Sequence, residues 1–256
     1  MLRQIFLFMC TLFSLVTFAG DYVTVKGRVT DYNGSPVDSC NVGIFNPDFS
    51  TAYSTYSDKD GYYRIDSVAK GTYASIYAMR LKEYPRMAAV EPKDMKLEFW
   101  AWNVIAEHDI DLDIRYDKLE LYGTTAFYEF GGRPELLVYT RPMSVTKVIN
   151  DPDFMNKAVQ EKKMKATVEP EFMEFEVFAD GKKLNIISVQ HLSLPCTNGN
   201  PNNDDCYLIQ TALPENIYNH SGKPYEIRVV GHNKEFDEWG ESVYYLAPAA
   251  YSSRKK

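Results

Sequence analysis

Residues 25–31 read VKGRVTD, and four short segments follow at intervals: GSPV at 34–37, NVGI at 41–44, SDKDGYY at 57–63 and GTY at 71–73. Short strand-like runs therefore alternate here with Gly, Pro, Asn and Asp, a spacing typical of sandwiches and barrels rather than of βαβ units. Gly34, Gly61 and Gly71 stand where tight turns need positive φ angles. This stretch predicts a series of short strands joined by turns.

The same organisation continues along the rest of the chain. Apolar and charged residues alternate with a period of two in IDLDI at 110–114, MEFEV at 173–177 and YEIRV at 225–229, which predicts strands with one solvated face. Asp180-Gly181 suits the positive φ angles of a hairpin turn. Nineteen Tyr, fourteen Phe and three Trp favour strands as well. We expect an all-β protein.

The segments between residues 25 and 73 resemble the carboxypeptidase regulatory-like domain, which is frequent in exported proteins of Bacteroidetes-type bacteria. The resemblance implies a small transthyretin-like β-sandwich, in which Gly34 closes a turn before Pro36 and Gly61 takes a corner between two strands. It implies no particular activity, because such sandwiches are accessory modules on many unrelated proteins. The segment 82–96 is longer than the family's usual connection.

Two domains are expected after the N-terminal segment. A boundary near residue 117 divides the chain into a regulatory-like sandwich at 20–117 and an immunoglobulin-like sandwich at 118–256. No flexible Gly/Ser linker separates them, so we expect two packed antiparallel β-sandwiches. One short helix is expected near 152–164, because Asp151 can cap it and Pro152 fits its first position.

Residues 1–19 predict a signal peptide. The charged Arg3 precedes an apolar run, and Ala19, with Thr17 two positions before it, offers a signal peptidase site. The run is short for a bilayer span, which takes ~20 apolar residues, and no second stretch of that length follows. We expect a mature chain that begins near Gly20, has no transmembrane anchor, and is periplasmic, bound to the cell surface or secreted.

The formal charge of −7 excludes the usual electrostatic footprint of nucleic-acid and anionic-membrane binding. The four histidines lie far apart, and HExxH, GxSxG and closely spaced cysteine pairs are all missing from the sequence. We therefore expect no metal site, no cofactor and no enzymatic activity.

Export leaves three cysteines. Cys196 and Cys206 bracket a polar loop at 197–205 between two apolar runs, where a disulfide would fasten the end of a hairpin. Asn and Asp oxygens in this loop also suit calcium, but the loop lacks the Asp-x-Asp-x-Asp-Gly register, so we favour the disulfide. Cys40 lies beside the strand expected at 42–44 and should be a buried free thiol.

Trp100 and Trp102 stand two residues apart and point to the same face if their segment is a strand. Two coplanar indoles can form a platform on which a sugar stacks, and the insertion at 82–96 can frame a cleft beside it. Packing of both rings in the core of the first sandwich is the more ordinary role of such residues.

The sequence therefore predicts an exported, non-enzymatic β-sandwich module of the cell envelope that binds an extracellular glycan or protein. One alternative is an accessory subunit or a hydrolase whose catalytic residues come together from distant strands. Another is a purely structural envelope component.

Overall fold

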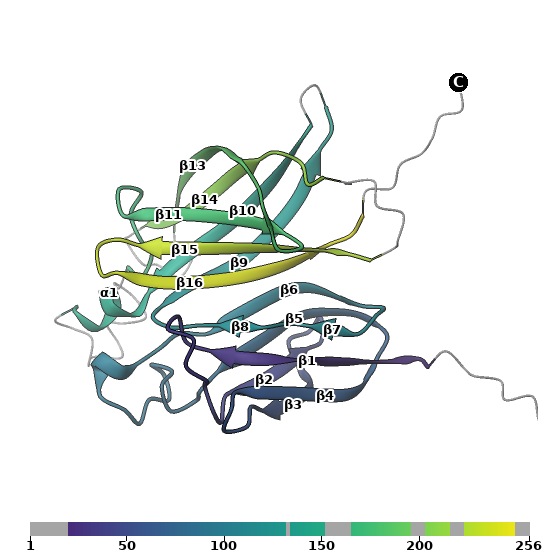
Figure 1. Cartoon of the computed structure of the whole chain (residues 1–256). Coiled ribbons are helices and arrows are strands. Elements are labelled where there is room, and N and C mark those ends of the chain that lie inside the picture. Colours follow the sequence, from purple (N-terminus) through teal and green to yellow (C-terminus); the bar gives the residue numbers. More distant parts are fainter. Residues whose placement is uncertain (1–19, 132–133, 152–164, 196–202, 216–222, 249–256) are drawn as a thin grey trace, which may run out of the picture.

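The computed structural model describes residues 20–131, 134–151, 165–195, 203–215 and 223–248, which are almost entirely β-structure (Figure 1). The predicted all-β fold class is confirmed. The strands form two four-stranded sheets and one eight-stranded sheet. Most neighbouring strands are antiparallel, as predicted, but β1 runs parallel to β7 and β8, and β6 runs parallel to β16.

The first four-stranded sheet is built around β1, which lies between β4 on one side and β7 and β8 on the other. Asp109 and Asp113, from the alternating stretch before and after β7, use their side chains to accept the backbone N–H groups of Thr24 (2.8 Å) and Arg28 (2.9 Å). These carboxylates therefore hold the parallel edge in place. The strands are β1 (Tyr22–Thr30), β4 (Tyr62–Ala69), β7 (Ile110–Asp111) and β8 (Ile114–Arg115).

The eight-stranded sheet crosses both halves of the molecule (Figure 1), because Trp100, Ala101 and Trp102 of β6 pair with residues 242–244 of β16. Its spatial order is β12-β11-β15-β16-β6-β5-β2-β3. In chain order, its members are β2 (Asn41–Phe45), β3 (Thr51–Tyr56), β5 (Gly71–Met79), β6 (Phe99–Ala106), β11 (Met173–Ala179), β12 (Lys182–Lys183), β15 (Tyr225–Asn233) and β16 (Glu238–Leu246).

The second four-stranded sheet has the order β13-β14-β10-β9 and belongs to the C-terminal half. Strand β9 packs against both β6 and β16 of the large sheet. The members of this sheet are β9 (Leu119–Glu129), β10 (Glu135–Ser144), β13 (Ile186–Pro195) and β14 (Asn203–Thr211).

The two hydrophobic cores lie on opposite faces of the large sheet. Along β16, Val243 and Tyr245 belong to the core of the first half, whereas Tyr244 and Leu246 pack with the core of the second half. Alternate residues of a strand point to opposite faces, so a single strand contributes to both cores. The first core otherwise draws on residues up to Tyr116 and the second begins at Leu119.

Two turns of the first half take the conformation that the sequence predicted. Gly34 has φ +82° and Gly61 has φ +84°. At Gly61 an added Cβ would lie 2.4 Å from the carbonyl oxygen of Val29, so a side chain is excluded by contact as well as by conformation. The hairpin predicted at Asp180-Gly181 is also present, because it joins β11 to β12 with φ angles of 46° and 76°.

Helical structure is limited to short pieces in the described part of the chain. The helix α1 (Val145–Ile149) begins after Ser144, whose side chain accepts the N–H of Lys147, and η1 (Pro92–Asp94) is a single 3-10 turn in the 82–96 insertion. Neither is long enough to cross a membrane. The helix predicted at 152–164 and the signal peptide predicted at 1–19 lie outside the described residues.

Candidate functional site

Trp100 and Trp102 lie on one face of β6, as predicted, and their rings stack with centroids 4.9 Å apart. This face is not the core of the first sandwich, which lies on the other side of the sheet. Strand β9 covers it instead: the ring of Tyr122 meets both indoles edge-on, and Glu120 accepts the indole N–H of Trp100 at 2.7 Å. Trp100 is buried, so the predicted pair does not form an open platform.

Trp102 is half-buried and still reaches the surface. It lines a pocket of about 520 Å³ at the seam between the two halves, together with Tyr73, Tyr122, Tyr244 and Asn103. The exposed Phe49 meets the ring of Trp102 edge-on, with centroids 6.5 Å apart. The sugar-stacking hypothesis is therefore restricted to Trp102 and this aromatic pocket.

The structure describes two of the cysteines, Cys40 and Cys206. Cys40 is a buried free thiol, as predicted, and burial raises its pKa to about 12. Cys206 is also buried, but Cys196 lies outside the described residues, so the disulfide between Cys196 and Cys206 stays a prediction. The partner of Cys206 across the β13–β14 hairpin is Leu192, well inside the ladder, so the hairpin is held there by strand pairing. Cys196 and most of the 197–205 loop lie outside the described residues.

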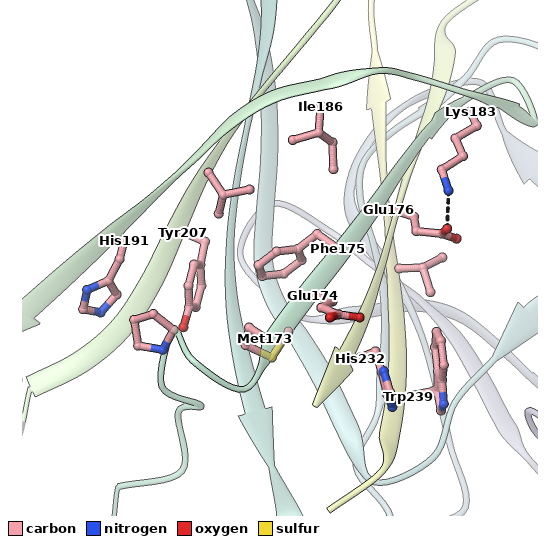
Figure 2. A pocket seen from close by; sticks show the side chains of 13 residues that line it. Met173, Glu174, Phe175, Glu176, Lys183, Ile186, His191, Tyr207, His232 and Trp239 are labelled. Carbon is pink, nitrogen blue, oxygen red and sulfur yellow. Dashed lines mark hydrogen bonds and ion pairs between the residues drawn. The ribbon is translucent and has the colours of Figure 1, made fainter. Parts of the chain in front are cut away.

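A groove of about 510 Å³ runs along the open side of the second sandwich, between β11 and β13 (Figure 2). Its inner wall is apolar: Phe175 and Tyr207 pack with ring centroids 5.1 Å apart, and Met173, Ile186 and Val189 lie beside them. Val189 is 45% exposed although it faces this wall. The interior of the sandwich is thus accessible from this side.

The outer wall of the groove is polar and aromatic. Glu174 and Glu176 alternate with Phe175 along β11, and His232 and Trp239 come from the neighbouring strands β15 and β16 (Figure 2). His232 stacks on Trp239 with a centroid distance of 4.1 Å and an interplanar angle of 10°. The groove therefore passes along both faces of β11.

The charged groups of the groove already have partners. Glu176 pairs with Lys183, and Glu174 lies 3.1 Å from Lys234. His191 and His232 each direct Nε2 at a carboxylate, of Asp205 (2.7 Å) and Asp237 (2.8 Å) respectively.

None of the thirteen residues that line the groove is Ser, Thr or Cys. Within the described ranges no three His, Cys, Asp or Glu side chains are placed to hold a metal ion together.

Sequence reasoning missed this groove. The alternation at 173–177 located β11 correctly, but we interpreted its glutamates as an ordinary solvated face. The remaining lining residues come from five other strands and the segment before β11, and have no shared local pattern. Only the alternation of β11 could have pointed to the site.

A buried pair of carboxyl groups was also missed. Glu98, just before β6, and Glu120, on β9, are 8% and 3% exposed. Burial raises the pKa of Glu98 to about 7. Burial and the nearby charge of Glu98 raise the pKa of Glu120 well above its usual range. Both groups therefore favour the protonated form in the folded protein.

Comparison with known families agrees with the architecture of the first half. Residues 24–81 match the carboxypeptidase regulatory-like domain. The match extends from β1 to just past the end of β5 and confirms the resemblance seen between residues 25 and 73. The regulatory-like domain therefore contributes both layers of the first sandwich, while β6 to β8 lie beyond the matched residues. A search of curated proteins found no match.

Several solved structures resemble the chain weakly. BcpA, the major pilin subunit of Bacillus cereus, is 13% identical over 88% of this chain and 69% of that chain, with a TM-score of 0.26. Fervidolysin from Fervidobacterium pennivorans, a keratinolytic enzyme related to subtilisin, is 12% identical over 90% and 30%, with a TM-score of 0.29. The major pilin SpaD from Corynebacterium diphtheriae is 8% identical over 87% and 64%, with a TM-score of 0.22. TM-scores this low carry no functional conclusion.

Proposed function

We propose that this chain is an exported, non-enzymatic β-sandwich module that binds an extended segment of an extracellular protein in the groove between β11 and β13. The observation that carries the proposal is that the groove follows both faces of an open strand edge. On one side, β11 pairs with β15 along its whole length. On the other side, β12 and Leu184 pair with β11 only from Val177 onward. The edge from Met173 to Glu176 on that side therefore has no strand partner among the described residues.

An added strand at this edge would meet two different walls. Its inward side chains would face Phe175, Val189 and Tyr207, whereas its outward side chains would face Glu174 and Trp239. Recognition by strand addition uses backbone hydrogen bonds for affinity and alternate side-chain pockets for specificity. The expected ligand is therefore a short segment that alternates apolar and polar residues.

The groove chemistry favours binding over catalysis. Its lining includes no Ser, Thr or Cys, and the hydroxyl group of Tyr207 donates to the carbonyl oxygen of Val168 (2.6 Å). The histidines and glutamates of the lining are held in ion pairs or hydrogen bonds. The signal peptide expected at 1–19 supports an extracellular setting for the ligand.

Peptides selected from a displayed random library should bind the mature chain, and their affinity should depend on alternate backbone amides. N-methylation of one alternate set of amides removes donors to β11 and should weaken binding by about tenfold or more. Methylation of the other set should have little effect, because those amides point away from the edge. Fluorescence anisotropy of labelled peptides measures both affinities.

Two variants of equal exposure provide the control. Val189→Lys places a charge on the inner wall and should weaken binding, whereas Phe127→Lys, on β9, should leave it unchanged; both side chains are 45% exposed in the native protein. A peptide affinity that is unchanged by both Val189→Lys and N-methylation would contradict the groove proposal. Cleavage of the bound peptide, seen by mass spectrometry, would contradict its non-enzymatic part.

A second candidate function is glycan binding at the pocket lined by Trp102. Aromatic rings from both halves converge there beside Asn103, a combination that suits the apolar face and the hydroxyl groups of a sugar. In titrations with a panel of soluble polysaccharides, Trp102→Ala should abolish binding, while Tyr62→Ala, which removes an exposed ring on β4, should not. Retained binding in Trp102→Ala, or no binding by the native chain, would exclude this site.

A further inference from the structure

Strand β13 is an open edge of a different sheet. It stands at the end of the order β13-β14-β10-β9 and pairs only with β14 among the described residues. It extends over ten residues, from Ile186 to Pro195. Large apolar side chains are exposed along it: Ile187 at 39%, Val189 at 45% and Leu194 at 42%.

Apart from the open edge of β11 at the groove, the other sheet ends of the described chain are protected. Strands β7, β8 and β12 have only two residues each, and β9 packs against β6 and β16. Strands β3 and β4 pack against each other at the far side of the first sandwich. Natural proteins commonly protect an edge strand by shortness, by charge or by cover, because an open edge pairs with other chains. β13 has a register irregularity between Ile186 and Ser188 and ends at Pro195, but within the described ranges no strand covers it and no charged residue lies on it.

The composition of β13 favours a second copy of itself as the partner. One residue in four of this chain is charged, yet residues 186–195, IISVQHLSLP, include no Asp, Glu, Lys or Arg. In a two-fold antiparallel pair, side chains near the axis meet their own equivalents, so a charge there would face a like charge. An uncharged strand with exposed apolar residues avoids this cost and gains apolar contacts.

We propose that β13 pairs with β13 of a second copy of this chain, in antiparallel orientation about a two-fold axis. The two four-stranded sheets then become one eight-stranded sheet that continues through both copies. This interface shares β13 with the groove, because Ile186, Val189 and His191 line the groove. Ile187 and Leu194 do not line it, so they test the pairing of β13 without changing the groove.

Sedimentation velocity of the mature chain over a range of concentrations tests the proposal. We expect a reversible monomer–dimer equilibrium with a dissociation constant of about 10 µM, a modest value for a small interface. Ile187→Lys and Leu194→Lys should each raise this constant by about tenfold or more. Phe127→Lys, at the opposite edge of the same sheet, should not change it. Circular dichroism confirms that each variant is folded.

Cysteine cross-linking locates the contact. With Cys196→Ser as background, single variants Ser188→Cys, Gln190→Cys and Leu192→Cys place thiols along β13, and the variant nearest the axis should form a covalent dimer on mild oxidation. A chain that stays monomeric at high concentration would overturn the proposal. So would a dimer whose dissociation constant is unchanged by Ile187→Lys and by Leu194→Lys and that forms no cross-link. Peptide binding in the groove would survive that outcome, so the two proposals fail separately.

Discussion

Glu241→Ala should lower the free energy of unfolding by about 3 kcal/mol, because it removes a buried carboxylate that two guanidinium groups share and leaves the largely buried Arg228 with only Glu226 as an acidic partner. The side chain of Glu241 is completely buried. Its carboxylate accepts the backbone N–H of Arg115 (3.0 Å) and hydrogen bonds from the guanidinium groups of Arg115 (2.7 Å) and Arg228 (2.5 Å). Arg115 belongs to the first half and Arg228 to the second, so this carboxylate joins the two.

Urea unfolding followed by tryptophan fluorescence measures the loss. The melting temperature should fall by roughly 10 °C, in proportion to the lost stability for a chain of this size. Glu176→Gln removes a partly exposed ion pair with Lys183 and should cost less than about 1 kcal/mol, which makes it the matched control.

A double substitution separates charge from packing. Replacing Arg228 and Glu241 together, in Arg228→Met with Glu241→Met, removes the two most buried charges of the network and leaves the more exposed Arg115 and Glu226 without these partners. The double variant should therefore cost less than Glu241→Ala alone. A Glu241→Ala variant within about 1 kcal/mol of the native protein would show that the network contributes little to joining the halves.

The sequence features that predicted the fold correctly are local. Gly34 and Gly61 mark turns because the chain needs positive φ at those positions, whatever surrounds them. The alternation at 173–177 reflects a strand between a core and solvent. Each signal depends on a few neighbouring residues, so a single sequence is sufficient to read it.

Features that join distant segments were not predictable. Nothing around Trp100 indicates that it pairs with Ser242, and this pairing makes one sheet of the two halves. For the same reason, sequence alone suggested a sugar platform or a core position for Trp100 and Trp102, although β9 covers them from the second half. The domain division at residue 117 remains a proposal, and the shared sheet leads us to expect one cooperative unfolding transition.

Loop composition does not define strand register. Cys196 and Cys206 bracket a polar segment, but β14 begins at Asn203, inside that segment, and brings Cys206 opposite Leu192. The disulfide between Cys196 and Cys206 stays a prediction, because Cys196 lies outside the described residues.

The stability of the protein should fall as the pH rises from 5 to 8, and Glu98→Gln should remove most of this dependence. The folded-state pKa of Glu98 is raised to about 7 by burial, whereas an unfolded glutamate titrates near 4.3. Between these values the folded state holds a proton that the unfolded state has released, so stability is lost as pH increases through this range. The difference corresponds to about 4 kcal/mol.

Thermal unfolding of both proteins at several pH values between 4 and 8 is the appropriate measurement. At pH 8 Glu98→Gln should be more stable than the native chain by about 4 kcal/mol, because the amide stays neutral without holding a proton. At pH 4 the two should be nearly equal.

Glu120→Gln should act in the same direction, since burial and the Glu98 charge also raise the pKa of Glu120. Glu174→Gln changes an exposed carboxylate and should leave the profile unaltered. If the stability of Glu98→Gln and that of the native chain changed with pH in parallel, Glu98 would be ionised in the folded protein. That result would contradict the prediction, because burial beside Glu120 favours the protonated form.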